Sequence, residues 1–215
     1  MKRVMIINGG PRKKFNTSIL LDEAAKGVRE SGAETETIHL YDFEYKGCNS
    51  CFACKHKNAT CKWKCTLKDH LSPILEKILS SDAVICGSPI YLGQVTGMTR
   101  CFLERLLFPL LSYEDSNRNF AGKIHSAFIY TMNLDYEEAI RRGYGYIFAT
   151  NERYMRNLGG TFEQLIIGDT YQFDDYHKYA AARFDEKHKD HIRKTQFPID
   201  RQKAFELGRK IVSGE

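Results

Sequence analysis

Five of the chain's seven cysteines lie in the segment "GCNSCFACKHKNATCKWKC", which runs from Gly47 to Cys65. Thiols at such short spacing suit three kinds of chemistry: an iron–sulfur cluster, a zinc ion, or reactive thiols that hold no metal. The pairs Cys48/Cys51 and Cys61/Cys65 have spacings that are found in structural zinc sites. In a metal-free loop, the neighbouring lysines would favour the reactive thiolate form. Cysteine spacing alone leaves all three interpretations open.

A second segment, "NGGPRKKFNTS" at residues 8–18, combines small turn residues, a basic stretch and an Asn-Thr-Ser that opens a helix. A helix N-terminus presents unpaired N–H groups and the positive end of the helix dipole, and together these bind phosphate. The hydroxyl groups of Thr17 and Ser18 add donors. The segment is neither a G-x-G-x-x-G fingerprint nor a P-loop, because no G-K-[ST] occurs. The alternative is a plain N-cap at Asn16 or Thr17 beside solvated lysines.

A third segment, "GSPIYLGQVTGMTR" at residues 87–100, has the residue types that bind a planar heterocycle. Glycine and proline around Ser88 favour a turn with exposed backbone amides. Tyr91 offers a flat aromatic face, while Gly93 and Gly97 permit close approach of the backbone to a ligand. Aromatic stacking with backbone hydrogen bonds is typical of such ligand sites. The alternative is an ordinary strand–helix loop with a core tyrosine.

These segments need strands and helices to hold them together. Short apolar runs predict five strands, at residues 3–8, 33–42, 82–89, 124–132 and 161–169. Helical spacing of apolar residues predicts helices at residues 17–31, 70–81, 97–110 and 135–159, followed by a polar helical tail. Strands that alternate with helices indicate a single parallel sheet covered on both faces.

We therefore expect an α/β protein with a three-layer, flavodoxin-like fold, in which a five-stranded parallel sheet has the order 2-1-3-4-5. Ligands of this topology bind at the carboxyl ends of the strands, near the switch point between strands 1 and 3. Residues 1–215 are predicted to form one domain. Within it, residues 41–67 form a cysteine-rich loop and residues 174–215 a helical C-terminal tail.

Together the second and third segments resemble two motifs of the NAD(P)H-dependent FMN reductase and iron–sulfur flavoprotein family, "GSPRxxGNTS" and "SPIYfgxvsGxxKxfiDR". The match covers residues 1 to about 110 well and continues more loosely to about 170. The residues that carry it are Pro11, Arg12, Asn16, Thr17 and Ser18 in the first motif, and Ser88, Pro89, Ile90, Tyr91, Gly97, Phe102 and Arg105 in the second.

The resemblance implies an enzyme that binds FMN and passes electrons from NAD(P)H, its co-substrate, to a quinone, a flavin or another acceptor. The flavin carries the chemistry, so no catalytic residue is expected. The FMN site would comprise Gly10, Pro11, Arg12, Asn16, Thr17, Ser18, Ser88, Pro89, Ile90, Tyr91, Gly97, Thr131, Met132 and Asn133. Gly10 stands where the family usually has serine, and Phe15 where it often has glycine. Both departures would weaken FMN binding.

The same resemblance bears on the cysteines. A subset of the family binds a [4Fe-4S] cluster through C-x2-C-x2-C-x4–7-C. The residues that fit this spacing are Cys48, Cys51, Cys54 and Cys61. Other members have a last cysteine followed by "xxxDD", a position that Cys65 occupies here together with Asp69. Cys65 is therefore the alternative ligand, and a cluster, zinc and free thiols all remain open.

Composition limits the possible partners. The net charge of +5 is spread over 215 residues without a dense block of Lys and Arg, so we expect no nucleic-acid partner. The apolar run near the N-terminus is too short for a signal peptide, and no stretch is long enough to span a membrane. We expect a cytoplasmic protein with a small-molecule or protein electron acceptor. The family resemblance implies a homodimer or homotetramer.

Overall fold

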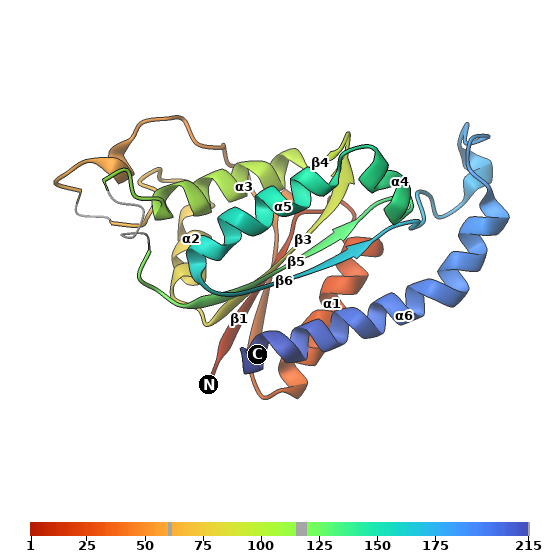
Figure 1. Cartoon of the computed structure of the whole chain (residues 1–215), viewed down its shortest axis with the longest axis horizontal. Coiled ribbons are helices and arrows are strands. Elements are labelled where there is room, and N and C mark those ends of the chain that lie inside the picture. Colours follow the sequence, from red (N-terminus) through yellow and green to blue (C-terminus); the bar gives the residue numbers. More distant parts are fainter. Residues whose placement is uncertain (60–61, 115–119, 215) are drawn as a thin grey trace.

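The structure, a computed structural model, describes residues 1–59, 62–114 and 120–214. Figure 1 shows a twisted sheet between two layers of helices. The strands are β1 (Arg3–Asn8), β2 (Glu34–His39), β3 (Ala83–Tyr91), β4 (Gln94–Val95), β5 (Ile124–Thr131) and β6 (Gly159–Ile167). The parallel order β2-β1-β3-β5-β6 confirms the predicted fold and strand order. The short β4, which sequence did not predict, pairs with β3 in antiparallel fashion.

The helices are α1 (Asn16–Glu30), α2 (Ser72–Leu79), α3 (Gly97–Leu107), α4 (Tyr136–Arg141), α5 (Gly145–Met155) and α6 (Glu186–Ser213). Alternate residues of each central strand face opposite helical layers. In β1, Val4 and Ile6 pack with α1 and α6, whereas Met5 and Ile7 pack with α2, α3 and α5. Both faces of the strand are therefore buried, which explains its continuous apolar run.

Two predicted helices differ from the structure. The helix expected at residues 135–159 is divided into α4 and α5 because Gly143, with φ of +84°, turns the chain between them. The tail was expected to be helical from Asp174, but α6 begins only at Glu186, where the carboxylate of Asp185 accepts a hydrogen bond from the His188 N–H (3.1 Å). Before it, aromatic side chains between residues 171 and 184 pack against one another instead.

The helices α1 and α6 pack at unusually short range. A Cβ atom on Gly27 would lie 2.0 Å from the Phe205 carbonyl oxygen, and one on Gly208 would lie 2.0 Å from that of Ala24. Pro198 lies inside α6, and Figure 1 shows that the helix changes direction along its length. The half after Pro198 packs along α1, whereas the half before it extends past the carboxyl edge of the sheet.

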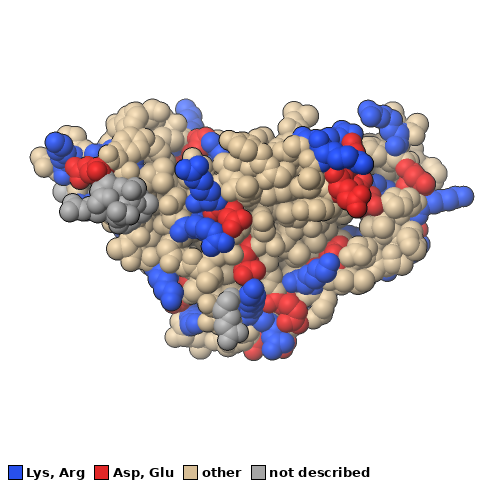
Figure 2. All heavy atoms as spheres, in the orientation of Figure 1, with Lys and Arg blue, Asp and Glu red and all other residues tan. Residues whose placement is uncertain are grey.

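Charged side chains of both signs are interspersed on the face shown in Figure 2, between broad uncharged areas. In the described part of the chain, no helix combines the length and apolar character needed to cross a lipid bilayer.

Candidate functional site

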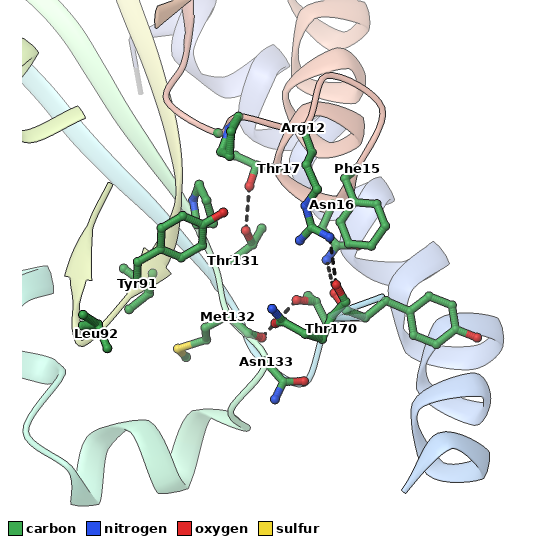
Figure 3. Close-up of a pocket in the computed structure, with 16 residues that line it drawn as sticks. Arg12, Phe15, Asn16, Thr17, Tyr91, Leu92, Thr131, Met132, Asn133 and Thr170 are labelled. Atoms are coloured by element: carbon green, nitrogen blue, oxygen red, sulfur yellow. Dashed lines mark hydrogen bonds between the residues drawn. The ribbon is translucent and has the colours of Figure 1, made fainter. Parts of the chain in front are cut away.

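A cavity of about 450 Å³ opens at the carboxyl edge of the sheet (Figure 3). Four segments line it: the β1–α1 loop, the end of β3, the end of β5 and the segment after β6. The predicted residues that it brings together are Gly10, Pro11, Arg12, Asn16, Thr17, Pro89, Ile90, Tyr91, Thr131, Met132 and Asn133. Its volume is in the range of small-molecule and cofactor sites, about 300–1,000 Å³.

The β1–α1 loop is fixed at its base by buried polar contacts. The Asn8 side chain accepts a hydrogen bond from the Gly10 N–H (2.9 Å) and meets His39 Nδ1 at 3.1 Å. Thr96, at the start of α3, donates from Oγ1 to the Gly9 carbonyl (2.7 Å). A Cβ atom on Gly9 would lie 1.8 Å from Thr99 Oγ1, so only glycine fits there. These contacts hold the loop against the neighbouring β3–α3 connection.

The N-terminus of α1 faces this cavity without a side-chain cap. Phe15 occupies the N-cap position and makes no capping hydrogen bond, so neither Asn16 nor Thr17 is the plain N-cap that the alternative interpretation required. Both of these residues are buried within the first turn. The first N–H groups of a helix have no intrahelical partner, and they carry partial positive charge. The arrangement suits an anionic group.

Arg12 and Tyr91 lie on opposite sides of the cavity in Figure 3. The Arg12 guanidinium lies over the Phe15 ring, 3.6 Å from its centroid, and donates to the Gln172 carbonyl (2.8 Å). Burial lowers the pKa of Arg12, while Tyr91 and Asp174 oppose that shift. Tyr91 keeps 42% of its surface exposed, and partial burial raises the pKa of its hydroxyl. A cation and an aromatic face thus border the same space.

Polar groups lie deeper in the cavity. The hydroxyl groups of Thr17 and Thr131 are hydrogen-bonded at 2.6 Å, which links α1 to the end of β5 (Figure 3). Asn133 Oδ1 is buried and has no hydrogen-bond partner among the described residues. Buried acceptors without partners are uncommon and costly. Because this oxygen is buried, a ligand in the cavity can reach it only if the Asn133 side chain shifts.

The wall after β6 was absent from the sequence-based site. It consists of Thr170, Tyr171 and Gln172. Asn16 Nδ2 donates to the Tyr171 carbonyl (2.7 Å), and Arg193 donates to Asn16 Oδ1 (3.2 Å), so this amide is already engaged with protein groups. No motif marks the wall. The only available signal was its place at the carboxyl end of the last strand, beside the other three segments.

Three predicted residues do not line the cavity. Ser18 is buried in the first turn of α1. Ser88 Oγ donates to the Pro89 carbonyl (2.8 Å) and accepts from the Thr96 N–H (3.1 Å), so it shapes the turn behind the cavity. Gly97 is the first residue of α3, behind the same turn. These residues support the loops that form the cavity.

The cysteine-rich loop holds no preformed metal site in the described part of the chain. Cys48, Cys51, Cys54 and Cys65 are free thiols, and no group of three or more potential ligands among the described residues converges. The predicted ligand Cys61 lies outside the described residues. Burial raises the pKa of the Cys54 thiol even though Lys55 opposes it, contrary to the activation expected from the lysines.

Cys65 is instead part of a buried arginine network. Arg105 is 1% exposed and donates from Nε to Cys65 Sγ (2.9 Å). Its two other nitrogens bind the Asp69 carboxylate at 2.8 and 3.1 Å, and they also donate to the carbonyls of Lys46 and Leu67. Burial acts against ionised Asp69, but the hydrogen bonds and charge of Arg105 lower its pKa overall. This network anchors the loop to α3.

Comparisons with known proteins identify a family for this sequence. The sequence model of a family described as NADPH-dependent FMN reductase matches residues 2–139. An iron–sulfur flavoprotein of Archaeoglobus fulgidus is 38% identical over 125 residues, which cover 58% of this chain and 59% of that protein. The chain spans about half the length of the curated relatives that it matches.

Two solved structures share the fold. An NAD(P)H:quinone oxidoreductase from Methanothermobacter marburgensis has a TM-score of 0.69 at 15% identity, with 98% of each chain covered. An FMN-dependent NADH-azoreductase from Bacillus anthracis, solved in complex with FMN, has a TM-score of 0.65 at 12% identity, covering 97% of this chain and 100% of the other.

Proposed function

The chain belongs to the NADPH-dependent FMN reductase family, and we propose that it is an oxidoreductase that binds FMN in the cavity at the carboxyl edge of the sheet. Electrons would pass from NAD(P)H through the flavin to a quinone, a second flavin or another acceptor. One observation carries the proposal: an uncapped helix N-terminus and a half-exposed tyrosine border the same cavity. A phosphate and an aromatic ring system within one ligand would use both.

The residues present fit that ligand. The α1 N-terminus and the Arg12 guanidinium would hold the phosphate, since both present donors and positive charge. The segment from Pro89 to Leu92 would border the ring system with an aromatic and aliphatic surface. When bound, FMN supplies the hydride and electron chemistry, and the protein supplies position, electrostatics and exclusion of water.

The test has two stages. Titration of flavin-free protein with FMN, followed by flavin fluorescence, measures binding directly. Oxidation of NADH or NADPH by the FMN-loaded protein is then followed with a panel of quinones, flavins and ferric chelates. Absence of binding would overturn the whole proposal. Binding without turnover with any acceptor would overturn the reductase activity and leave a flavin-binding protein.

A second candidate function is electron transfer by an iron–sulfur flavoprotein with a [4Fe-4S] cluster on Cys48, Cys51, Cys54 and Cys61. It is supported by the cysteine spacing and by relatives that bear that name. The described thiols do not converge as they stand, so binding a cluster requires the loop to rearrange. Iron and acid-labile sulfide analysis of anaerobically prepared protein tests this function. About four of each per chain would support it, and their absence would eliminate it.

A further inference from the structure

We propose that Arg193, in the half of α6 before Pro198, is a positioning residue that keeps the N-terminus of α1 open to a ligand phosphate. This inference rests on the proposed FMN site and names a residue that does not line the cavity. Arg193 Nη1 donates to Asn16 Oδ1 (3.2 Å), and Asn16 Nδ2 donates to the Tyr171 carbonyl (2.7 Å). Both ends of the Asn16 amide are therefore directed toward α6 and the wall after β6.

The position of Asn16 at the start of α1 explains why this contact matters for phosphate binding. Asparagine side chains readily form hydrogen bonds with neighbouring backbone N–H groups. Asn16 is the first residue of α1, beside the N–H groups that no side chain caps. With Arg193 occupying Oδ1, the amide oxygen is held away from those groups. Without Arg193, the same oxygen can compete with a phosphate for them.

Arg193 is itself held firmly. Its guanidinium carbon lies 4.1 Å from the centroid of the Phe197 ring and 5.6 Å from that of Tyr171. Aromatic faces attract a guanidinium and restrict its rotamers. Tyr171 is fixed in turn, because its hydroxyl donates to the Asp190 carboxylate. In the folded structure, these ring contacts therefore hold the Arg193 guanidinium toward Asn16.

Charge distinguishes Arg193 from its neighbour Lys189. The Lys189 ammonium donates to the Asn133 carbonyl (2.7 Å) but is paired with the Asp169 carboxylate. Arg193 has no carboxylate within ion-pair distance among the described residues. Its positive charge adds to the potential at the start of α1, whereas that of Lys189 is neutralised. Of these two cations, Arg193 is the one expected to favour an anion at the helix start.

The experiment compares FMN with riboflavin, which lacks the phosphate, in the full-length chain. Arg193→Ala is expected to weaken FMN binding about tenfold, the effect of losing one contact that serves a charged group. Riboflavin binding should change by less than about twofold, because its ring site is untouched. Arg193→Lys should recover part of the FMN affinity by restoring the charge. Fluorescence titration measures both dissociation constants, and thermal melting confirms folding.

Arg201→Ala provides a matched control. Arg201 also links α6 to α1, through a hydrogen bond from Nε to Glu23 (3.0 Å), but it lies in the half of α6 after Pro198, away from the cavity. Arg201→Ala should leave the ratio of the FMN and riboflavin dissociation constants unchanged. Equal losses for both ligands in Arg193→Ala, or no loss for FMN, would overturn the inference. If the wild-type chain binds FMN, such results refute only the role of Arg193; if it binds no FMN, both proposals fall.

Discussion

The ring of Phe15 supports the guanidinium of Arg12 at the edge of the cavity. Sequence comparison suggested that an aromatic residue in this loop weakens FMN binding. The structure suggests compensation, because a stacked guanidinium loses less freedom when it binds an anion. Phe15→Ala is therefore expected to raise the FMN dissociation constant about three- to fivefold, which corresponds to about 0.5–1 kcal/mol. Fluorescence titration measures this dissociation constant. Phe15→Tyr keeps the ring and should bind normally; tighter binding by Phe15→Ala would contradict the compensation.

Breaking the pair of Arg105 and Asp69 is expected to destabilise the fold strongly. Asp69→Ala leaves the buried guanidinium without its carboxylate, and breaking a buried pair costs about 3–5 kcal/mol. Chemical denaturation measures the loss in free energy of unfolding. Arg100→Ala is the control on the same helix, since its pair with Glu104 is at the surface and should contribute less than about 1 kcal/mol. Similar losses in the two variants would refute the special role of the buried pair.

The same carboxylate predicts a pH dependence. Its folded-state pKa lies below the ordinary value of 3.8, so the unfolded chain takes up the proton first. Its contribution to stability is complete above about pH 5 and is lost as pH falls below about 4 toward the folded pKa. Denaturation curves between pH 3 and 7 should show a steeper acid loss for the wild type than for Asp69→Asn. Parallel curves would contradict this assignment.

At the residue scale, the two loop motifs predicted most of the cavity, because their glycine, proline and hydroxyl residues have clear local roles. The wall at residues 170–172 could not be predicted, since no local pattern shows which loops meet in space. The contact of Cys65 with Arg105 was likewise invisible, because burial of an arginine depends on the packing of segments 40 residues apart.

At the element scale, the long strands were the most predictable part. A parallel strand buried on both faces gives a continuous apolar run, as β1 and β3 do. Helix ends were less predictable. The apolar pattern continues on both sides of Gly143, so it gave no sign that the helix is interrupted there. The polar composition of the segment before α6 favoured a helix, but aromatic side chains pack against one another there instead.

Replacing a glycine inside a helix by alanine usually stabilises a protein. The close packing of α1 on α6 predicts the opposite effect at Gly208. Gly208→Ala gains up to about 1 kcal/mol of helix propensity. The added methyl would meet the Ala24 carbonyl at 2.0 Å, and such overpacking costs about 1–3 kcal/mol or more. We expect a net loss that lowers the melting temperature by several degrees. Gly145→Ala, where the nearest atom is 3.4 Å away, should be neutral or stabilising. A more stable Gly208→Ala variant would contradict the packing.

At the scale of the whole molecule, exposed apolar side chains occur on the β3–β4 turn, α4 and α5, and the surface considered below is defined by Leu92, Tyr136, Ile140 and Tyr146. The β3–β4 turn that carries Leu92 adjoins the connection between α4 and α5, because a Cβ atom on Gly93 would lie 3.2 Å from Tyr144. Apolar patches of this kind often mark interfaces between proteins. We propose that a second copy of the chain covers this surface, which would give the homodimer or homotetramer that the family resemblance implies.

Light scattering after size-exclusion chromatography tests this proposal. The chain has a mass of 24.8 kDa, and we expect a particle of at least about twice that mass. Tyr146→Ser should shift the equilibrium toward the monomer. Tyr113→Ser, at another exposed tyrosine outside this surface, should not. A monomeric wild type at high concentration would end this proposal without affecting the assignment of the FMN cavity.

Pro198 gives α6 an internal boundary. Proline has no backbone N–H, so one hydrogen bond of the helix ladder is missing where the two halves join. The half after Pro198 contributes Ala204, Leu207 and Ile211 to the core, whereas the half before it contributes Phe197 and makes polar contacts with the loops around the cavity. Cooperative units of a protein can open separately with different free energies. We therefore expect the half that carries Lys189 and Arg193 to open, together with the cavity wall, at a lower cost in free energy than the half that follows Pro198.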